Sequence, residues 1–209
     1  MKLPFLAIVL LFVIILAFGI QRSNRKMAKS EKNFWDREHD ANFSRKKSLE
    51  NIDYISITDD VKNLVGCLLD DSNCSEISES LQNIVSLYGK KIFNLNGISN
   101  TDVKLRYGAA NITPLSEYDE NYTILITSLN SVGVFLADNN RSSDAEIILD
   151  YATSIGSDIP SSYTILANIF KDTGRGELLH LLIKRAESAH SFRSETIIKS
   201  LTEILDTVS

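Results

Sequence analysis

The N-terminal segment constrains the fold more than any other part of the sequence. Residues 3–20 read LPFLAIVLLFVIILAFGI, eighteen residues without a charged or strongly polar side chain. As a helix rising 1.5 Å per residue they cover about 27 Å, close to the hydrocarbon thickness of about 30 Å. Backbone groups in lipid must find partners within their own segment, which a helix provides. The sequence therefore predicts a transmembrane anchor over residues 1–21.

A cleaved signal peptide is the alternative for this segment. Lys2 supplies a minimal charged start, and Ala17-Phe18-Gly19 has the small-x-small pattern of a cleavage site. However, the apolar run is longer than the usual signal-peptide core of about 7–15 residues. Cations also follow it at once, as they follow an anchor that stays in place. We therefore favour the uncleaved anchor.

Residues 22–57 form a basic juxtamembrane stalk. Between Arg22 and Lys47 there are nine Lys/Arg and four Asp/Glu, whereas only Lys2 and the α-amino group precede the apolar run. Segments rich in Lys and Arg stay in the cytoplasm. The sequence thus predicts a single-pass protein of the cell membrane with a cytoplasmic C-terminal domain; the alternative is an exported, anchored cell-envelope protein whose domain faces outward. We expect contact with the surface of the lipid bilayer from Arg22, Arg25, Lys26, Lys29 and Trp35.

The stalk does not have the composition of a passive linker. Residues 32–57 contain neither Gly nor Pro, and they hold the only tryptophan. Three explanations stay open for its aromatic residues: they rest at the membrane interface, they pack back onto the following domain, or they bind a partner. Phe34 and Trp35 are expected on the first turns of a helix, and the apolar residues from Leu49 to Ile57 as a short strand or an extended segment.

The remaining residues, 58–209, predict a helical domain. Apolar residues recur at helical spacing from Val61 onward. A period of 34 residues then appears. Leu129-x2-Val132-Gly133-x2-Leu136 and Ala145-x3-Leu149-x2-Ala152 are matched 34 positions later by Tyr163-x2-Leu166-Ala167-x2-Phe170 and Leu179-x3-Ile183-x2-Ala186. The small residues let neighbouring helices approach closely. We expect units at about 126–159 and 160–193, with a capping helix at 194–207.

This pattern resembles the tetratricopeptide (TPR) repeat. The resemblance implies an all-α fold in which antiparallel helical hairpins stack into a short right-handed solenoid, here joined to the transmembrane helix. It departs from the family at Leu179, which replaces a small residue, and an ordinary antiparallel helix bundle is the alternative. TPR-like domains bind a protein or peptide in the groove lined by the first helix of each unit. By resemblance, that groove would include Asn130, Val134, Thr164, Asn168 and Lys171.

The sequence offers little sign of catalysis. It has no phosphate-binding loop, HExxH, GxSxG or CxxC motif, so we expect no cofactor, metal site or catalytic residue. Residues 48–209 hold twelve Lys/Arg against twenty-three Asp/Glu, a net charge of −11 that argues against nucleic acid as a partner. An enzyme therefore has little support. The expected function is that of a membrane-anchored scaffold or adaptor that binds another protein.

Overall fold

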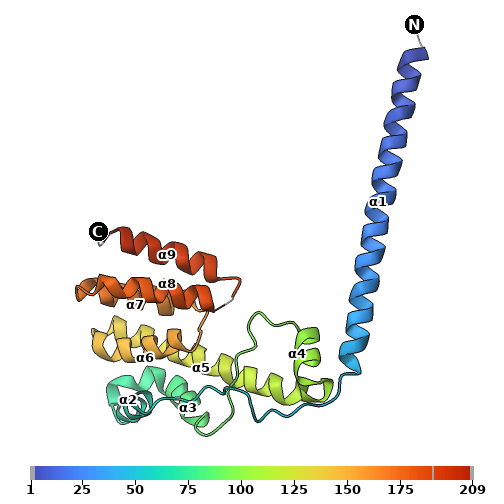
Figure 1. Cartoon of the computed structure of the whole chain (residues 1–209). Helices are drawn as coiled ribbons and strands as arrows, with labels where there is room; N and C mark the ends of the chain where they lie inside the picture. The colour runs from blue at the N-terminus through green and yellow to red at the C-terminus, as the bar shows by residue number, and fades with distance from the viewer. Residues whose placement is uncertain (1–2, 190, 208–209) are drawn as a thin grey trace. The chain divides into compact units, whose positions relative to one another are not determined.

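The computed structural model describes residues 3–189 and 191–207, and the side chains from residue 12 onward apart from residue 14. The regular secondary structure of the described residues is entirely helical, without a strand, which confirms the all-α fold class (Figure 1). Their helices are α1 (Leu3–Asn42), α2 (Asp59–Leu69), η1 (Ser72–Ile77), α3 (Ser78–Ser86), α4 (Asn100–Tyr107), η2 (Ala109–Asn111), α5 (Ile112–Asp138), α6 (Ser142–Ser154), α7 (Pro160–Asp172), η3 (Gly176–Leu178), α8 (Leu179–Ser188) and α9 (Ser194–Asp206).

The chain forms two compact units that interleave along the sequence. The first contains the residues up to Ser48 together with residues 99–112, and the second contains residues 49–98 and 113 onward. This grouping differs from the three consecutive segments that the sequence suggested. The residues of α4 and η2 belong with the stalk, although some fifty residues separate them from it.

Helix α1 runs through the expected boundary between anchor and stalk without a break. Its 40 residues correspond to a length of about 60 Å. Phe34 and Trp35 therefore lie near the end of a long helix and not on the first turns of a new one, which corrects the expectation. Because no Gly or Pro interrupts residues 21–42, nothing in the sequence ends the helix at the apolar run.

In the described part of the chain, no helix combines the length and the apolar character that crossing a membrane requires. Ten of the eighteen residues of the expected span, 3–11 and 14, lie outside those whose side chains are described.

The second unit is built from helices that pack in sequence order. Helix α6 packs on α7, α7 on α8 and α8 on α9, and there are further contacts between α6 and α8 and between α7 and α9. Most apolar positions of the 34-residue pattern lie in its core, and these are fully buried: Leu129, Val132, Leu136, Ala145, Leu149, Ala152, Tyr163, Leu166, Ala167, Leu179 and Ala186. Ile183, by contrast, is only partly buried, and its neighbour Leu182 is fully buried in its place. The hydrophobic face of each helix is thereby removed from water, which is the main force stabilising the unit.

Helix α5 begins earlier than the sequence suggested. Residues 94–120 are rich in turn-forming residues, which predicts an irregular connection with one short helix. In the structure α4 lies in this segment, and α5 already starts at Ile112. Pro114 lies in the first turn of α5, where the missing N–H has no intrahelical partner to lose. Thr113-Pro114 therefore marks the start of a helix and not a turn.

Candidate binding surfaces

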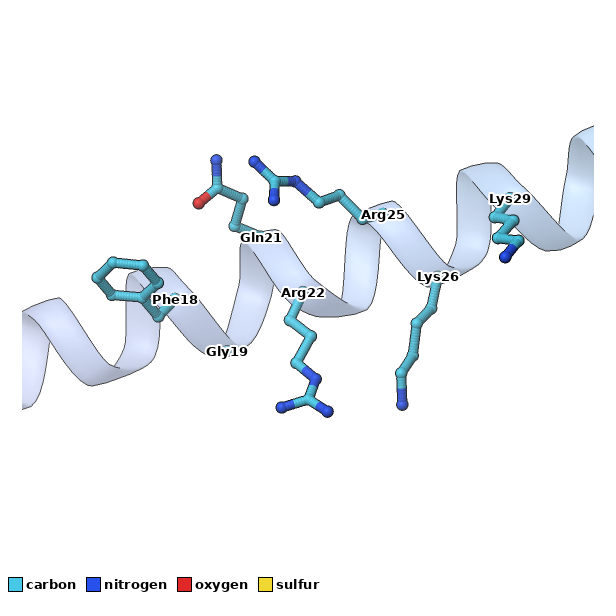
Figure 2. A pocket seen from close by; sticks show the side chains of 7 residues that line it. All are labelled: Phe18, Gly19, Gln21, Arg22, Arg25, Lys26 and Lys29. Carbon is cyan, nitrogen blue, oxygen red and sulfur yellow. The ribbon is translucent and has the colours of Figure 1, made fainter.

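A collar of four cations follows the apolar run directly on α1. Arg22, Arg25, Lys26 and Lys29 are exposed and extend from the helix just beyond Phe18 (Figure 2). Their positions at spacings of three, one and three residues distribute them around more than one side of the helix. The expected membrane-surface cations are thus brought together on one short stretch of α1.

Trp35, the fifth residue expected at the membrane surface, lies farther away. It is exposed and fifteen residues beyond Ile20, which is about 22 Å along the helix axis. The headgroup region on each side of the hydrocarbon is only about 5–8 Å deep. An upright α1 would hold Trp35 clear of the headgroups, and only a strongly tilted helix would bring it to them.

The last turns of α1 are held against α4 by a polar network, which we call the stalk clamp. Its side chains come from residues 37–47 and from residues 99–111: Arg37, Glu38, Asn42, Ser44 and Lys47 on the first segment, and Thr101, Asp102, Lys104 and Asn111 on the second. Ala41 of α1 and Val103 of α4 are also buried, and the two helices pack against each other. The stalk clamp thus joins segments about sixty residues apart through charged and polar hydrogen bonds.

Glu38 and Lys104 lie at the centre of the stalk clamp. The Lys104 ammonium donates to a Glu38 carboxylate oxygen and also to the side-chain oxygen of Asn42, at 2.7 Å. The Thr101 hydroxyl donates to the other Glu38 oxygen. These hydrogen bonds, that from Lys104 first, hold the pKa of Glu38 below its ordinary value. Arg37 forms an ion pair with Asp102 beside them.

Backbone contacts complete the stalk clamp after α1 ends. The Ser44 hydroxyl donates to the Lys104 carbonyl at 2.7 Å and accepts from the Ala109 N–H at 3.0 Å. The Asn111 amide donates to the carbonyls of Lys47 and Tyr107, at 2.7 Å each. Gly108 has φ +93°, and a Cβ at this position would lie 2.2 Å from the Arg45 carbonyl oxygen. Only glycine fits this close backbone approach.

Sequence analysis did not identify the stalk clamp, because helical periodicity does not report polar contacts between distant segments. A local signal was nevertheless present. Ser99 caps α4 by accepting from the Asp102 N–H at 3.2 Å, and its hydroxyl donates to the Asp102 carboxylate. This Ser-x-x-Asp spacing resembles a capping box, which marks the start of a helix.

The residues expected to line a TPR-like groove differ in their exposure and in the hydrogen bonds that they form. Asn130 accepts hydrogen bonds from the hydroxyls of Ser161 and Ser162, at 2.7 and 2.9 Å, so its side-chain oxygen already joins α5 to α7. Val134 and Thr164 are half-buried.

The other two expected groove residues, Asn168 and Lys171, are exposed on α7. The Lys171 ammonium also donates to the Thr207 hydroxyl, at 2.9 Å. Asn168 and Lys171 are therefore the accessible members of the set.

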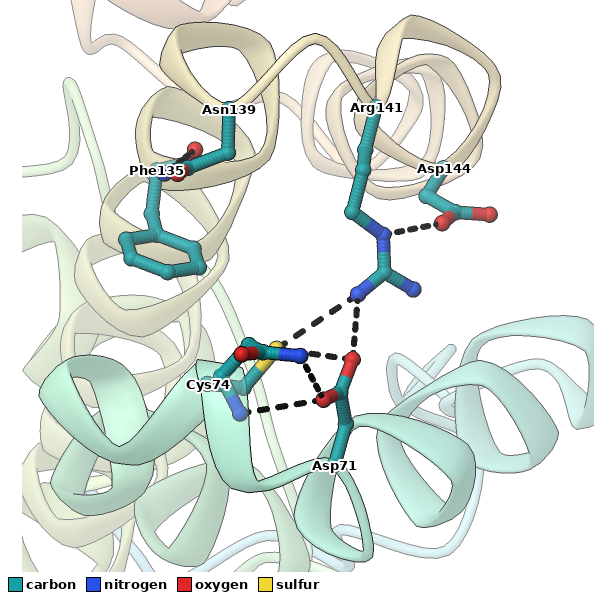
Figure 3. Close-up of polar contacts among 7 residues, drawn as sticks. Asp71, Cys74, Phe135, Asn139, Arg141 and Asp144 are labelled. Carbon is teal, nitrogen blue, oxygen red and sulfur yellow. Dashed lines mark hydrogen bonds and ion pairs between the residues drawn. The ribbon is translucent and has the colours of Figure 1, made fainter.

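Arg141 forms a second polar cluster, in the turn between α5 and α6 (Figure 3). Its guanidinium contacts Asp71 at 3.0 Å, Asp144 at 2.8 Å and the Cys74 sulfur at 3.5 Å. Asp71 caps η1 through the Asn73 N–H, and this bond is the main reason that the pKa of Asp71 is lowered. Burial raises the pKa of the Cys74 thiol. This arrangement joins two turns, and the raised pKa of Cys74 disfavours its reactive thiolate form.

The segment from Leu49 to Ile57 has a turn at residues 50–51, contains neither helix nor strand, and packs on the helices of the second unit. The Ile55 N–H donates to the Ile92 carbonyl at 2.9 Å, and the Tyr151 hydroxyl donates to the Ser56 carbonyl at 3.1 Å. Ile57 is buried. Of the explanations for the stalk, packing onto the helical domain therefore applies to this segment, whereas residues 37–47 pack on α4.

Among the described residues, no three His, Cys, Asp or Glu side chains are grouped so that they could hold a metal ion. Comparisons of the chain with family models, curated proteins and solved structures find no significant match.

Proposed function

We propose that this protein is a membrane-anchored scaffold whose helical domain binds a protein or peptide segment. The observation that carries the proposal is the organisation of the first 42 residues. Eighteen uncharged apolar residues are followed at once by the exposed cations Arg22, Arg25, Lys26 and Lys29 on the same continuous helix. A bilayer accommodates this order, with the apolar run in hydrocarbon and the cations at anionic headgroups.

The facing direction follows from the same cations. Because positively charged flanks are retained in the cytoplasm, the helical domain faces the cytoplasm. The exported orientation is the second candidate, and a topology reporter separates the two. A C-terminal fusion to a phosphatase that is active only after export should be inactive, and a fusion to a cytoplasmic fluorescent protein should be bright. Phosphatase activity would contradict the cytoplasmic orientation.

Anchoring itself is tested by fractionation of cells that make the full chain. We expect the protein to sediment with membranes and to stay there after alkaline carbonate extraction, which removes peripheral proteins. A variant with Val13→Lys and Leu16→Lys should lose this retention, since two charges in the hydrocarbon cost roughly 5–7 kcal/mol by insertion scales. Recovery of the unmodified protein in the soluble fraction would contradict the anchor.

The binding half of the proposal is supported by the regular arrangement of the second unit. Its helices α6 to α9 pack in order, with further contacts between α6 and α8 and between α7 and α9, and the 34-residue pattern supplies most of the buried positions of α6 and α7. By the TPR resemblance, such helices would present the first helix of each unit to a ligand. Lys171 and Asn168 supply an ammonium and an amide on the exposed side of α7, which suits an extended segment with free carbonyl or carboxylate oxygens.

The groove is tested by crosslinking in intact membranes. A partner captured by the unmodified chain should be lost with Asn168→Ala or Lys171→Glu. Lys184→Glu, the same charge change at an exposed position of α8, is the matched control and should retain the partner. Equal capture by Lys171→Glu and Lys184→Glu would contradict the proposed groove.

A further inference from the structure

One face of α1 lacks charge throughout an otherwise highly charged segment. Residues 20–34 contain six Lys, Arg and Glu, yet positions spaced alternately three and four residues apart avoid them all. These positions are Ile20, Ser23, Met27, Ser30 and Phe34. Of the seven possible heptad registers over this segment, it is the only one without a charged residue. Such spacing is that of the a and d positions of a coiled coil.

The same face continues in both directions along α1. Towards the N-terminus the register includes Leu16 and Val13, both exposed. Towards the C-terminus it reaches Arg37 and Ala41, where α4 packs on the helix and Ala41 is 0% exposed. By contrast, Met27 is 67% and Phe34 56% exposed. The chain therefore covers this face itself within the stalk clamp and leaves it bare from Val13 to Phe34, over about 32 Å of helix.

We propose that a second copy of this chain covers the bare face, so that two α1 helices form a parallel coiled coil, which we call the α1 seam. The flanking charges indicate this occupant. With Ile20 and Met27 at a, Lys26 occupies g and Glu31 the following e position. In a parallel pair g of one helix faces e of the other five residues on, so Lys26 of each copy faces Glu31 of the other.

The other cations of the collar, together with Lys32 beyond it, are compatible with the α1 seam. Arg22, Arg25, Lys29 and Lys32 occupy c and f positions, which point away from a partner helix. They can therefore contact lipid headgroups while the two helices are paired. The serines at 23 and 30 let the backbones approach closely but bury little apolar surface.

The parallel alignment rests on the proposed anchor. Two copies inserted in one bilayer enter in the same direction and start from the same depth. Confinement raises their effective concentration, which compensates for a seam with few large apolar side chains. We therefore expect a pair that is stable in membranes and dissociates at low concentration in detergent.

Disulfide crosslinking of the full chain in isolated membranes tests the α1 seam. All variants carry Cys67→Ser, because Cys67 is an exposed thiol. Ser23→Cys and Ser30→Cys place thiols on the seam, and Arg22→Cys and Lys29→Cys place them one residue away, facing outward. With a mild oxidant we expect covalent dimers from the two seam positions and at least fivefold less from the two outward ones. Equal yields at all four positions, or no dimer from the seam positions, would overturn the proposal.

A charge exchange tests the register. Lys26→Glu should lower the yield of Ser30→Cys dimers, since two Glu side chains then face each other. Adding Glu31→Lys to Lys26→Glu should restore it, and a double variant that stays low would overturn the parallel alignment. The proportion of each variant that sediments with membranes is measured on the same samples. Loss of sedimentation contradicts the anchor, whereas absence of seam crosslinks in protein that does sediment contradicts the seam alone.

Discussion

Gly133 provides the most direct test of the close packing between α5 and α6. A Cβ added there would lie 2.3 Å from Leu149 Cδ2 and 2.6 Å from its Cγ, more than about 1 Å short of ordinary contact. Leu149 is fully buried, so its side chain cannot move into solvent. Such overpacking typically costs about 1–3 kcal/mol. Against this, alanine is favoured over glycine inside a helix by about 1 kcal/mol.

A matched control separates these two contributions. Gly66 lies in α2, and a Cβ there would meet nothing within 4 Å. Gly66→Ala should therefore raise the free energy of unfolding by up to about 1 kcal/mol, from helix propensity alone. Gly133→Ala has the same favourable helix propensity, but it also introduces the overpacking against Leu149, which lowers the free energy of unfolding. We expect it to be less stable than Gly66→Ala by about 1–3 kcal/mol.

The measurement is urea unfolding of the purified full-length chain, followed by circular dichroism at 222 nm. A third variant, Leu149→Ala combined with Gly133→Ala, removes the atoms that the new methyl group would meet. The cost of the two substitutions together should be smaller than the sum of their separate costs. Equal stabilisation by Gly66→Ala and Gly133→Ala would refute the close approach of α5 and α6.

Three further predictions concern the stalk clamp and the thiols. Gly108→Ala should release the clamp, because its Cβ would meet the Arg45 carbonyl; faster amide exchange in α4 would show this, and unchanged exchange would refute it. The hydrogen bonds to the ionised Glu38 lower its pKa, so they stabilise the clamp at pH values above the ordinary pKa of 4.5. This stabilisation should be lost as the pH falls below 4.5, and it should be absent at every pH in Glu38→Gln. Amide exchange in α4 measures both effects. Native protein should react with maleimide at Cys67 alone and at Cys74 only after unfolding; rapid native labelling of both would contradict the burial of Cys74.

The sequence predicted best those helices whose apolar positions repeat at helical spacing. The residues from Val61 to Leu69 lie in α2, and the capping helix expected at 194–207 corresponds to α9 at Ser194–Asp206. In both, a buried face requires apolar residues every three or four positions, and this signal is visible without tertiary information. The buried positions of α6 to α8 follow the same rule.

The start of α5 could not be located in this way. Its first turns contain Thr113-Pro114, a pair that is equally typical of a turn, and the short α4 directly precedes it. Packing favours the helix over a turn here, because Leu115 and Tyr122 are buried along the early part of α5. Tertiary burial here overrides a local turn signal, as it does for weak helix propensities in general.

The groove residues expected from the TPR resemblance show a different limit. Repeat spacing assigns Asn130 and Asn168 to equivalent surfaces, but it does not report which side chains the protein uses for itself. The side-chain oxygen of Asn130 already accepts hydrogen bonds from the hydroxyls of Ser161 and Ser162, whereas Asn168 is exposed. A family pattern gives the position of a side chain on a helix, and only the three-dimensional contacts decide its availability.

The stalk clamp and the α1 seam use the same face of α1, so each should limit the other. Ala41 continues the seam register but is covered by α4. A thiol at this position, Ala41→Cys, should therefore give little crosslinked dimer while the clamp is closed. Adding Gly108→Ala, which opposes the clamp through its contact with the Arg45 carbonyl, should expose the position and raise the dimer yield towards that of Ser30→Cys. Gly89→Ala, at another glycine of positive φ but with open space around it, is the control and should leave the yield low. If Ala41→Cys forms dimers as readily with the clamp intact as with Gly108→Ala, α4 does not end the α1 seam.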